Sequence, residues 1–326
     1  MVSVDSKTPQ TPPIAPLYQT ICGAIQSDGT LPADFSLPRP KPPEEGKLRF
    51  ADGAFDGISL YHMAPDQRDI KSLTEIVGLI CAGSYDQAEE CLILFFSTDE
   101  FVSMLPLIDN LQQWIIDNRT QIDPQHLYTF CLHLLKNSAH IESIKFALSC
   151  LELLNISEDT QVRNLIRVLA LSNEFTLFCL YVMRDWSDSS DSIFDAAQHV
   201  SGWGRIHAVE ALTPTSDAMR RWLLLQGWHN DVIDEYSALT CAEKTDLLGR
   251  LRKNDLDNEE WAAAGQLLST LLNDGPTIGI DGLEEPQAMI DAYFAAAKTR
   301  TLSEAEAKIS EEIQEKWTQK QSDHQE

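Results

Sequence analysis

The residues best suited to chemistry gather between Ser201 and Leu251. One predicted helix carries Arg205, His207 and Glu210, and the last two stand one helical turn apart, so they can share a face. An imidazole beside a carboxylate could form an acid–base pair or contribute to a metal site. The chain lacks the HExxH pattern of zinc peptidases, and its eight histidines form no ligand cluster in the sequence. A structural hydrogen-bonding role for His207 is therefore favoured.

The same stretch contains closely spaced aromatic and polar residues that could line a groove. Trp203 and Trp228 adjoin glycines at predicted helix ends, and aromatic side chains are good interface anchors, although core packing explains them as well. Asn230 is suited to cap a helix beginning near Val232, or alternatively to bind a ligand backbone. Our candidate binding residues are Trp203, Arg205, His207, Glu210, Trp228, Asn230 and Glu235.

No motif in the chain predicts catalysis, a metal or a cofactor. The phosphate-binding pattern GxxxxGK[ST], a GxGxxG following a strand and the nucleophile motif GxSxG are all missing from the sequence. The acidic stretches 185–191 and 254–260 lack the glycine and glutamate positions that an EF-hand calcium loop requires. We therefore name no catalytic residue, no metal ligand and no cofactor, and an enzyme is the less favoured class.

The charge of the chain restricts its partners. Lys and Arg number 25 against 50 Asp and Glu, for a formal net charge of -25. This balance opposes binding to nucleic acid and to anionic membranes, which both require clustered cations. It fits plain solubility or a basic protein partner.

The cysteines and the hydropathy pattern bear on location. Seven widely spaced cysteines, without a CxxC pair, lie mostly among apolar neighbours and are typical of buried free thiols in a reducing compartment. The N-terminal sequence has no signal-peptide pattern, and no apolar run reaches transmembrane length. We expect a cytoplasmic protein.

The elements that must position the candidate residues are helices. From about residue 67 onward, apolar residues recur at three- and four-residue steps, in segments of about 10–15 residues separated by about 2–6. Asp123 followed by Pro124 predicts a helix start, and Ser303 with Glu306 predicts a capping box. Short connections favour antiparallel neighbours, and helix pairs with a period of about 30–40 residues favour a solenoid, with a compact bundle as the alternative.

The chain is expected to have three regions. Residues 1–66 form a Pro-rich arm with one short helix at 15–26 and, at 46–63, a short strand or hairpin built on turns at Gly53 and Gly57. The Pro-rich runs are read as a connecting arm, with docking to a proline-recognising domain as the alternative. Residues 67–300 form the helical-repeat domain. Residues 301–326 form an acidic C-terminal helix, partly projecting into solvent, with a frayed tail.

The segment WGRIHAVEAL…MRRWLLLQGWHNDVIDEYSALTCA, residues 203–242, carries a resemblance. It resembles HEAT-like repeats, and it is similar to a group of uncharacterised bacterial proteins. The resemblance is sharpest over these 40 or so residues, and as an architecture it extends over 67–272. It implies an all-α fold of stacked antiparallel helical hairpins, a HEAT-like α-solenoid, preceded by an irregular Pro/Gly-rich segment. It implies no catalytic residues.

The composition, the motifs and the resemblance leave three candidate functions. The favoured one is a non-enzymatic interaction or scaffold module that binds a protein or peptide on a solenoid surface. A sharper version is an acidic immunity or antitoxin-type inhibitor of a basic toxin. The third is an enzyme with a concave-surface site, among which a DNA glycosylase is disfavoured by the charge.

Overall fold

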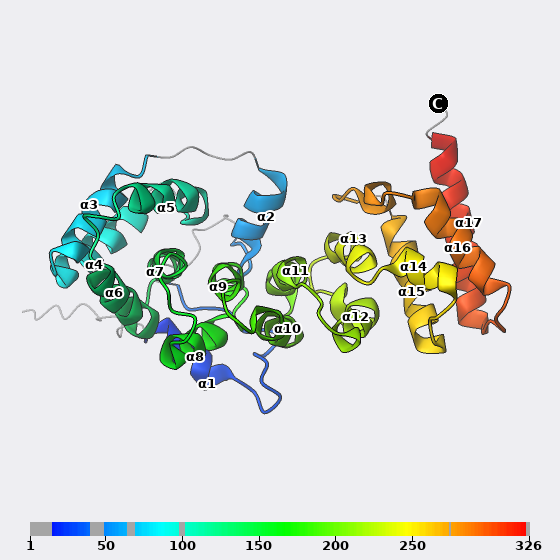
Figure 1. Ribbon diagram of the computed structural model, residues 1–326, viewed down its shortest axis with the longest axis horizontal. Coiled ribbons are helices and arrows are strands. Elements are labelled where there is room, and N and C mark those ends of the chain that lie inside the picture. Colours follow the sequence, from blue (N-terminus) through cyan, green and yellow to red (C-terminus); the bar gives the residue numbers. More distant parts are fainter. Residues whose placement is uncertain (1–14, 40–48, 64–68, 98–101, 274, 324–326) are drawn as a thin grey trace, which may run out of the picture. The chain divides into compact units, whose positions relative to one another are not determined.

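The computed structural model describes residues 15–39, 49–63, 69–97, 102–273 and 275–323. These residues form seventeen α-helices and three short helical turns, and none of them is in a strand (Figure 1). The prediction of an all-α fold is therefore confirmed. The chain divides into two compact units, residues 1–169 and 170–326, so the predicted repeat domain at 67–300 spans parts of both.

The described residues of unit 1 form eight α-helices and one 3-10 turn. They are α1 (Leu17–Ala24), α2 (Ala54–His62), α3 (Lys71–Cys81), α4 (Tyr85–Phe96), η1 (Leu105–Leu107), α5 (Ile108–Asp117), α6 (Pro124–Asn137), α7 (Ile141–Leu151) and α8 (Thr160–Leu169). Consecutive helices pack as pairs, α3 with α4 and α6 with α7, and α3 also packs on α6.

Helix α7 is the centre of unit 1, since every residue from Ser143 to Leu151 is buried. The start of its partner α6 follows the predicted signal. The side chain of Asp123 accepts hydrogen bonds from the backbone N–H groups of Gln125 and His126, and Pro124 occupies the first helical position. The predicted helix start at this position is confirmed.

The N-terminal region is part of the core of unit 1. Helix α1 packs on α6 and α8, its residues Leu17 and Ile21 are fully buried, and the Leu17 N–H donates to the Ser138 carbonyl at 2.9 Å. The short helix predicted at 15–26 is confirmed. The proline pair at 12–13 and the prolines of 40–43 lie outside the described residues.

The hairpin predicted at 46–63 is wrong, because the described part of this stretch forms helix α2. Gly53 does take a positive φ, of 77°, but it stands at the N-cap of the helix and not in a hairpin turn. Asp56 of α2 is buried against Lys145 of α7, and this long-range ion pair fixes a helix that local sequence does not specify.

The part of unit 2 that the structure describes contains nine α-helices with one π-helical and one 3-10 segment. They are α9 (Thr176–Met183), α10 (Ser189–His199), α11 (Gly202–Ala211), α12 (Asp217–Trp222), η2 (Leu223–Gly227), α13 (Glu235–Lys244), α14 (Leu247–Lys253), α15 (Asn258–Leu271), η3 (Gly279–Gly282), α16 (Pro286–Ala297) and α17 (Glu304–Asp323).

The helices of unit 2 contact one another in a regular order. Helix α11 packs on α9, α13 on α11, α15 on α13 and α17 on α15, while α10 packs beside α11. At the end of the series, Ile313 of α17 is fully buried, and Lys316 donates to Ser269 and Asn273. The capping box predicted at Ser303 and Glu306 is confirmed by reciprocal hydrogen bonds of 2.7 and 3.3 Å.

Candidate functional site

Four of the predicted binding residues, Trp203, Arg205, His207 and Glu210, lie on α11 in unit 2. The side chains of Trp203 and His207 are buried, and the Trp203 ring lies 5.0 Å from Tyr236 of α13 and 6.1 Å from the His207 ring. Burial lowers the pKa of His207 to about 4. His207 is therefore a neutral core group at pH 7, and it does not open onto a surface.

Arg205 contacts Val200, which precedes α11, and Trp222 at the end of α12. Its Nε donates to the Val200 carbonyl at 2.9 Å, and its guanidinium lies 5.5 Å from the centre of the Trp222 ring. Burial lowers the pKa of Arg205, and the nearby Asp231 carboxylate partly opposes that effect. The cation is held by a carbonyl and an aromatic face, which is a packing role.

Trp228 and Asn230 organise the turn before α13. The indole N–H of Trp228 donates to the Leu224 carbonyl, and the ring is buried. The Asn230 Oδ1 accepts from the N–H groups of Val232 and Ile233, while its Nδ2 donates to the Ile233 carbonyl. The side chain of Asn230 is thus engaged in this turn, but it does not cap a helix near Val232 as predicted, because α13 begins at Glu235 with Asp234 at its N-cap.

Glu210 and Glu235 also make contacts within unit 2. Glu210 accepts from the hydroxyl of Thr240 at 2.6 Å, and Glu235 accepts from Nδ2 of Asn273 at 2.8 Å. The predicted residues therefore contact several different segments of unit 2, among them the residue before α11, the segment η2, helix α13 and the residues after α15. Three of them, Trp203, His207 and Trp228, are buried and so do not line an open surface.

The glycines of the SGWGR segment have a packing reason. Gly202 takes a φ of 48°, and the Gly204 N–H donates to Oδ1 of Asn173 at 2.8 Å. A methyl group at Gly204 would stand 2.6 Å from both Asn173 Oδ1 and Thr176 Oγ1. Glycine at 204 therefore lets α11 approach α9 closely, and this close approach explains why a glycine stands at this position of the SGWGR segment.

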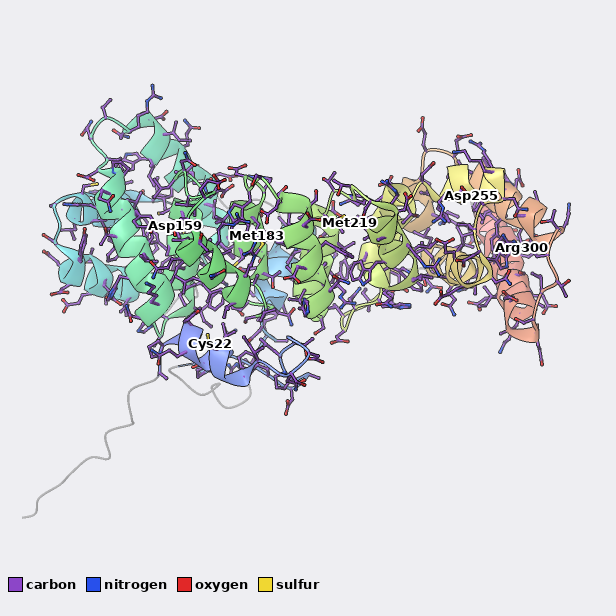
Figure 2. All side chains as sticks on the ribbon, turned by 60° about the horizontal axis from the view of Figure 1, so that its bottom comes forward. Cys22, Asp159, Met183, Met219, Asp255 and Arg300 are labelled. Atoms are coloured by element: carbon purple, nitrogen blue, oxygen red, sulfur yellow. The ribbon has the colours of Figure 1, made fainter. Side chains whose placement is uncertain are left out.

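A different set of residues in unit 2 forms an open, charged cleft of about 670 Å³. Its walls come from α12, from the turn between α13 and α14, and from the loop that leads into α15. Met219 and Asp255 are labelled in Figure 2 and mark α12 and that loop. The charged residues lining this unit 2 cleft are Asp217, Arg220, Arg221, Glu243, Lys244, Asp246, Arg250, Asp255 and Glu260.

Glu260 is the centre of the cleft's ion pairs. Its carboxylate is buried and lies 2.8 Å from Nη2 of Arg250 and 3.2 Å from Nη1 of Arg221. Arg221 also pairs with Asp257 at 2.6 Å and with Glu259. The hydrogen bond to Asp257 raises the pKa of Arg221, so the guanidinium is charged at any physiological pH.

The start of α15 holds these carboxylates in place. Asp257 and Glu260 form a reciprocal capping box, in which each side chain accepts from the other residue's backbone N–H. The hydrogen bond from the Glu260 N–H, aided by Arg221, lowers the pKa of Asp257. The sequence carried this signal in DNEE, but helix capping alone does not reveal that arginines of α12 and α14 meet there.

Lys244 closes the cleft from the side of α13. Its Nζ donates to the carbonyls of Val209, Glu210 and Leu212 at 2.9, 2.5 and 2.8 Å, and so caps the C-terminus of α11. Burial lowers the pKa of Lys244, and the neighbouring Glu210 opposes that shift. All three ammonium protons have acceptors, which favours a capping role over a reactive amine.

The backbone beside the cleft departs from regular helix at two points. Asp246 takes a left-handed conformation with a φ of 48°, and its carboxylate lies over Gly249, where any side chain would collide with it. The π-helical segment η2 follows directly after Arg221 and Trp222. Left-handed non-glycine residues and π-helical segments are both enriched at functional sites, and Asp246 itself lines this cleft.

A second, smaller hollow of about 330 Å³ lies in unit 1, beside the starts of α6 and α8. The Tyr128 hydroxyl donates to Asp159 at 2.6 Å, and Asp159 also accepts from the N–H groups of Gln161 and Val162. Burial and this hydrogen bond raise the pKa of Tyr128 to about 12. Asp159 is thus engaged in capping α8.

Among the described residues, no group of three or more His, Cys, Asp or Glu side chains is placed to hold a metal ion. No helix in the described part combines the length and apolar character needed to cross a membrane. Comparison of the chain with protein-family models, with curated proteins and with solved structures found no match. The residues themselves must therefore carry any functional conclusion.

Proposed function

We propose that the protein is a non-enzymatic interaction module and that its unit 2 cleft binds a basic segment of a partner protein. The observation that carries this proposal is the uneven exposure of the cleft's charges. The Asp217 side chain is fully exposed and Asp255 is 52% exposed, whereas Arg220, Arg221 and Arg250 are 36%, 37% and 19% exposed. These two carboxylates are therefore more accessible to a partner than the arginines of the cleft.

Arginines hold these carboxylates in position, since Arg220 lies 3.4 Å from Asp217 and Arg250 lies 3.5 Å from Asp255. Beside the cleft, Arg221 bonds to Asp257 and Glu259, which are both more than half exposed. Because the carboxylates are already ordered by internal pairs, binding costs less side-chain entropy. The net charge of -25 would in addition steer a basic partner toward the protein. A basic toxin, as inferred from the composition, would be one such partner.

We also propose that unit 2 is a HEAT-like solenoid of stacked helical hairpins. The series of contacts from α9 through α11, α13 and α15 to α17 supports this, since each helix packs on the next but one. The cleft then lies on the side of α12 and α14. The seven free cysteines, four of which are buried, support the proposed cytoplasmic location.

The test uses a fluorescently labelled deca-lysine peptide and measures its binding by anisotropy at low and raised salt. The variant Asp217→Asn/Asp255→Asn removes two cleft carboxylates, and we expect it to weaken binding about three- to tenfold. The matched control Glu311→Gln/Glu315→Gln removes two exposed charges from α17, away from the cleft lining, and should change binding little. Equal losses in the two variants would mean that only net charge matters, and the proposal would fail.

A further inference from the structure

Helix α4 in unit 1 has an outer face that no other described residue covers. Only Ala88 and Leu92 are buried, through the packing of α4 on α3 and α7. In its last two turns Leu94 is 71% exposed, the highest value for a large apolar side chain among the described residues, and Phe95 and Phe96 are only half-buried. Apolar side chains exposed together at one end of a helix can serve as a docking site.

The first two turns of α4 are acidic. They carry Asp86, Glu89 and Glu90, and the helix has no Lys or Arg. Of these three, Glu89 pairs with His133 of α6 at 3.1 Å, while Asp86 and Glu90 are exposed. Along this helix of about 18 Å, the outer face is therefore negative in its N-terminal half and apolar in its C-terminal half.

The side chains on this face form the rows that helix packing uses. Glu90 and Leu94 stand four residues apart on one ridge, and Cys91 with Phe95 forms the neighbouring row. No strand is present in the described part of the chain, so there is no sheet edge to which an extended peptide could add. A partner must therefore bind through side chains, as an amphipathic helix does.

We infer that the outer face of α4 docks an amphipathic helix of a partner protein, with apolar residues over Leu94 and Phe95 and cations over Asp86 and Glu90. This surface lies in unit 1 and shares no residue with the unit 2 cleft, so the inference does not depend on the cleft. The occupant is a helix of about three turns, with apolar positions at i, i+3 and i+4 followed by Lys or Arg about two turns away.

The charge pattern argues against two other occupants. A second copy of this chain would meet α4 through a twofold axis. If the two α4 helices ran parallel, acidic turns would face acidic turns, and if they ran antiparallel, acidic turns would face apolar ones. An anionic membrane surface would be repelled by Asp86 and Glu90. A basic amphipathic helix can pair its cations with the acidic half of the face and pack its apolar side chains on the apolar half.

The probe is a designed 14-residue helix with Leu on one face of its first half and Lys in its second half. Its affinity is measured by anisotropy, and its footprint by hydrogen-exchange mass spectrometry of the full chain. We expect slower exchange in 85–97, and we expect Leu94→Ser to weaken binding at least about tenfold through lost apolar burial. Circular dichroism should show unchanged folding of the variant, because Leu94 is mostly exposed.

Two matched variants control for hydrophobicity and charge. Ile278→Ser removes an apolar side chain that is 65% exposed in unit 2, and it should leave affinity unchanged. Asp86→Asn/Glu90→Gln should weaken binding about three- to tenfold, whereas Glu311→Gln/Glu315→Gln should not.

Three results would overturn the inference. Equal effects of Leu94→Ser and Ile278→Ser would show non-specific hydrophobic binding. Protection that spares 85–97 would place the probe elsewhere, and a concentration-dependent dimer lost in Leu94→Ser would make a second copy the occupant. Failure here is separable from failure of the cleft, because deca-lysine binding should not respond to Leu94→Ser, and protection of 85–97 by the Leu/Lys helix should persist in Asp217→Asn/Asp255→Asn.

Discussion

Replacing Lys145 by methionine should destabilise unit 1 by about 3–5 kcal/mol, because it leaves buried carboxylates without their cation. The Lys145 ammonium lies 2.6 Å from Asp56 and 3.1 Å from Glu142, and the Lys145 and Asp56 side chains are only 2% and 4% exposed. Asp56 also accepts from the Ser103 hydroxyl at 2.9 Å. This buried network joins α2, α7 and the segment before η1.

Native-state hydrogen exchange measures this loss within unit 1 alone. At about 1.4 kcal/mol per factor of ten, the expected destabilisation lowers protection in α7 by between about 100-fold and 4000-fold. The effect should be confined to peptides from unit 1, since none of the network's residues lies in unit 2.

The double variant Lys145→Met/Asp56→Leu removes both charges of the closest pair, so it should recover at least half of the lost protection. As a control, Arg252→Met breaks the ion pair with Glu285, whose members are both half exposed, and it should not change protection measurably. If Lys145→Met behaved like Arg252→Met, the buried pair would contribute little, and our account of why α2 is held in place would be refuted.

Three more predictions concern other parts of the molecule. Burial lowers the pKa of His207 to about 4, so as the pH falls the imidazole is protonated in the unfolded chain before it is protonated in the folded one. The contribution of neutral His207 to the free energy of unfolding should therefore be complete above about pH 6.5 and fall by about 3 kcal/mol towards pH 4. Urea titrations should show that His207→Phe flattens this pH dependence. Gly204→Ala should cost about 2 kcal/mol or more in thermal melts through its clash with Asn173, whereas Gly78→Ala, in open space on α3, should stabilise by up to about 1 kcal/mol. Lys244→Met should cost about 1–2 kcal/mol, seen as faster exchange at the C-terminus of α11, because three carbonyls lose their donor; unchanged exchange would contradict this role.

Local signals in the sequence were sufficient wherever a helix is specified by its own residues. Asp123 with Pro124 and Ser303 with Glu306 act over one turn, and apolar spacing marks which face is buried, so these elements follow from the sequence. The same reasoning failed at 46–63. Gly53 and Gly57 resemble turn residues, but the stretch forms α2, whose Asp56 is paired with Lys145, 89 positions further along the chain.

For the candidate site, too, some features follow from local sequence and others only from tertiary packing. The sequence by itself determined an acidic, all-helical protein and drew attention to residues 203–235, where unusual polar and aromatic residues cluster. Only the tertiary structure decided that Trp203, His207 and Asn230 have internal roles, while Arg221, Arg250 and Glu260 meet in a cleft. The physical reason is range: helix periodicity and capping act within a few residues, whereas a cleft is made by side chains from helices distant in sequence, whose meeting depends on how those helices pack.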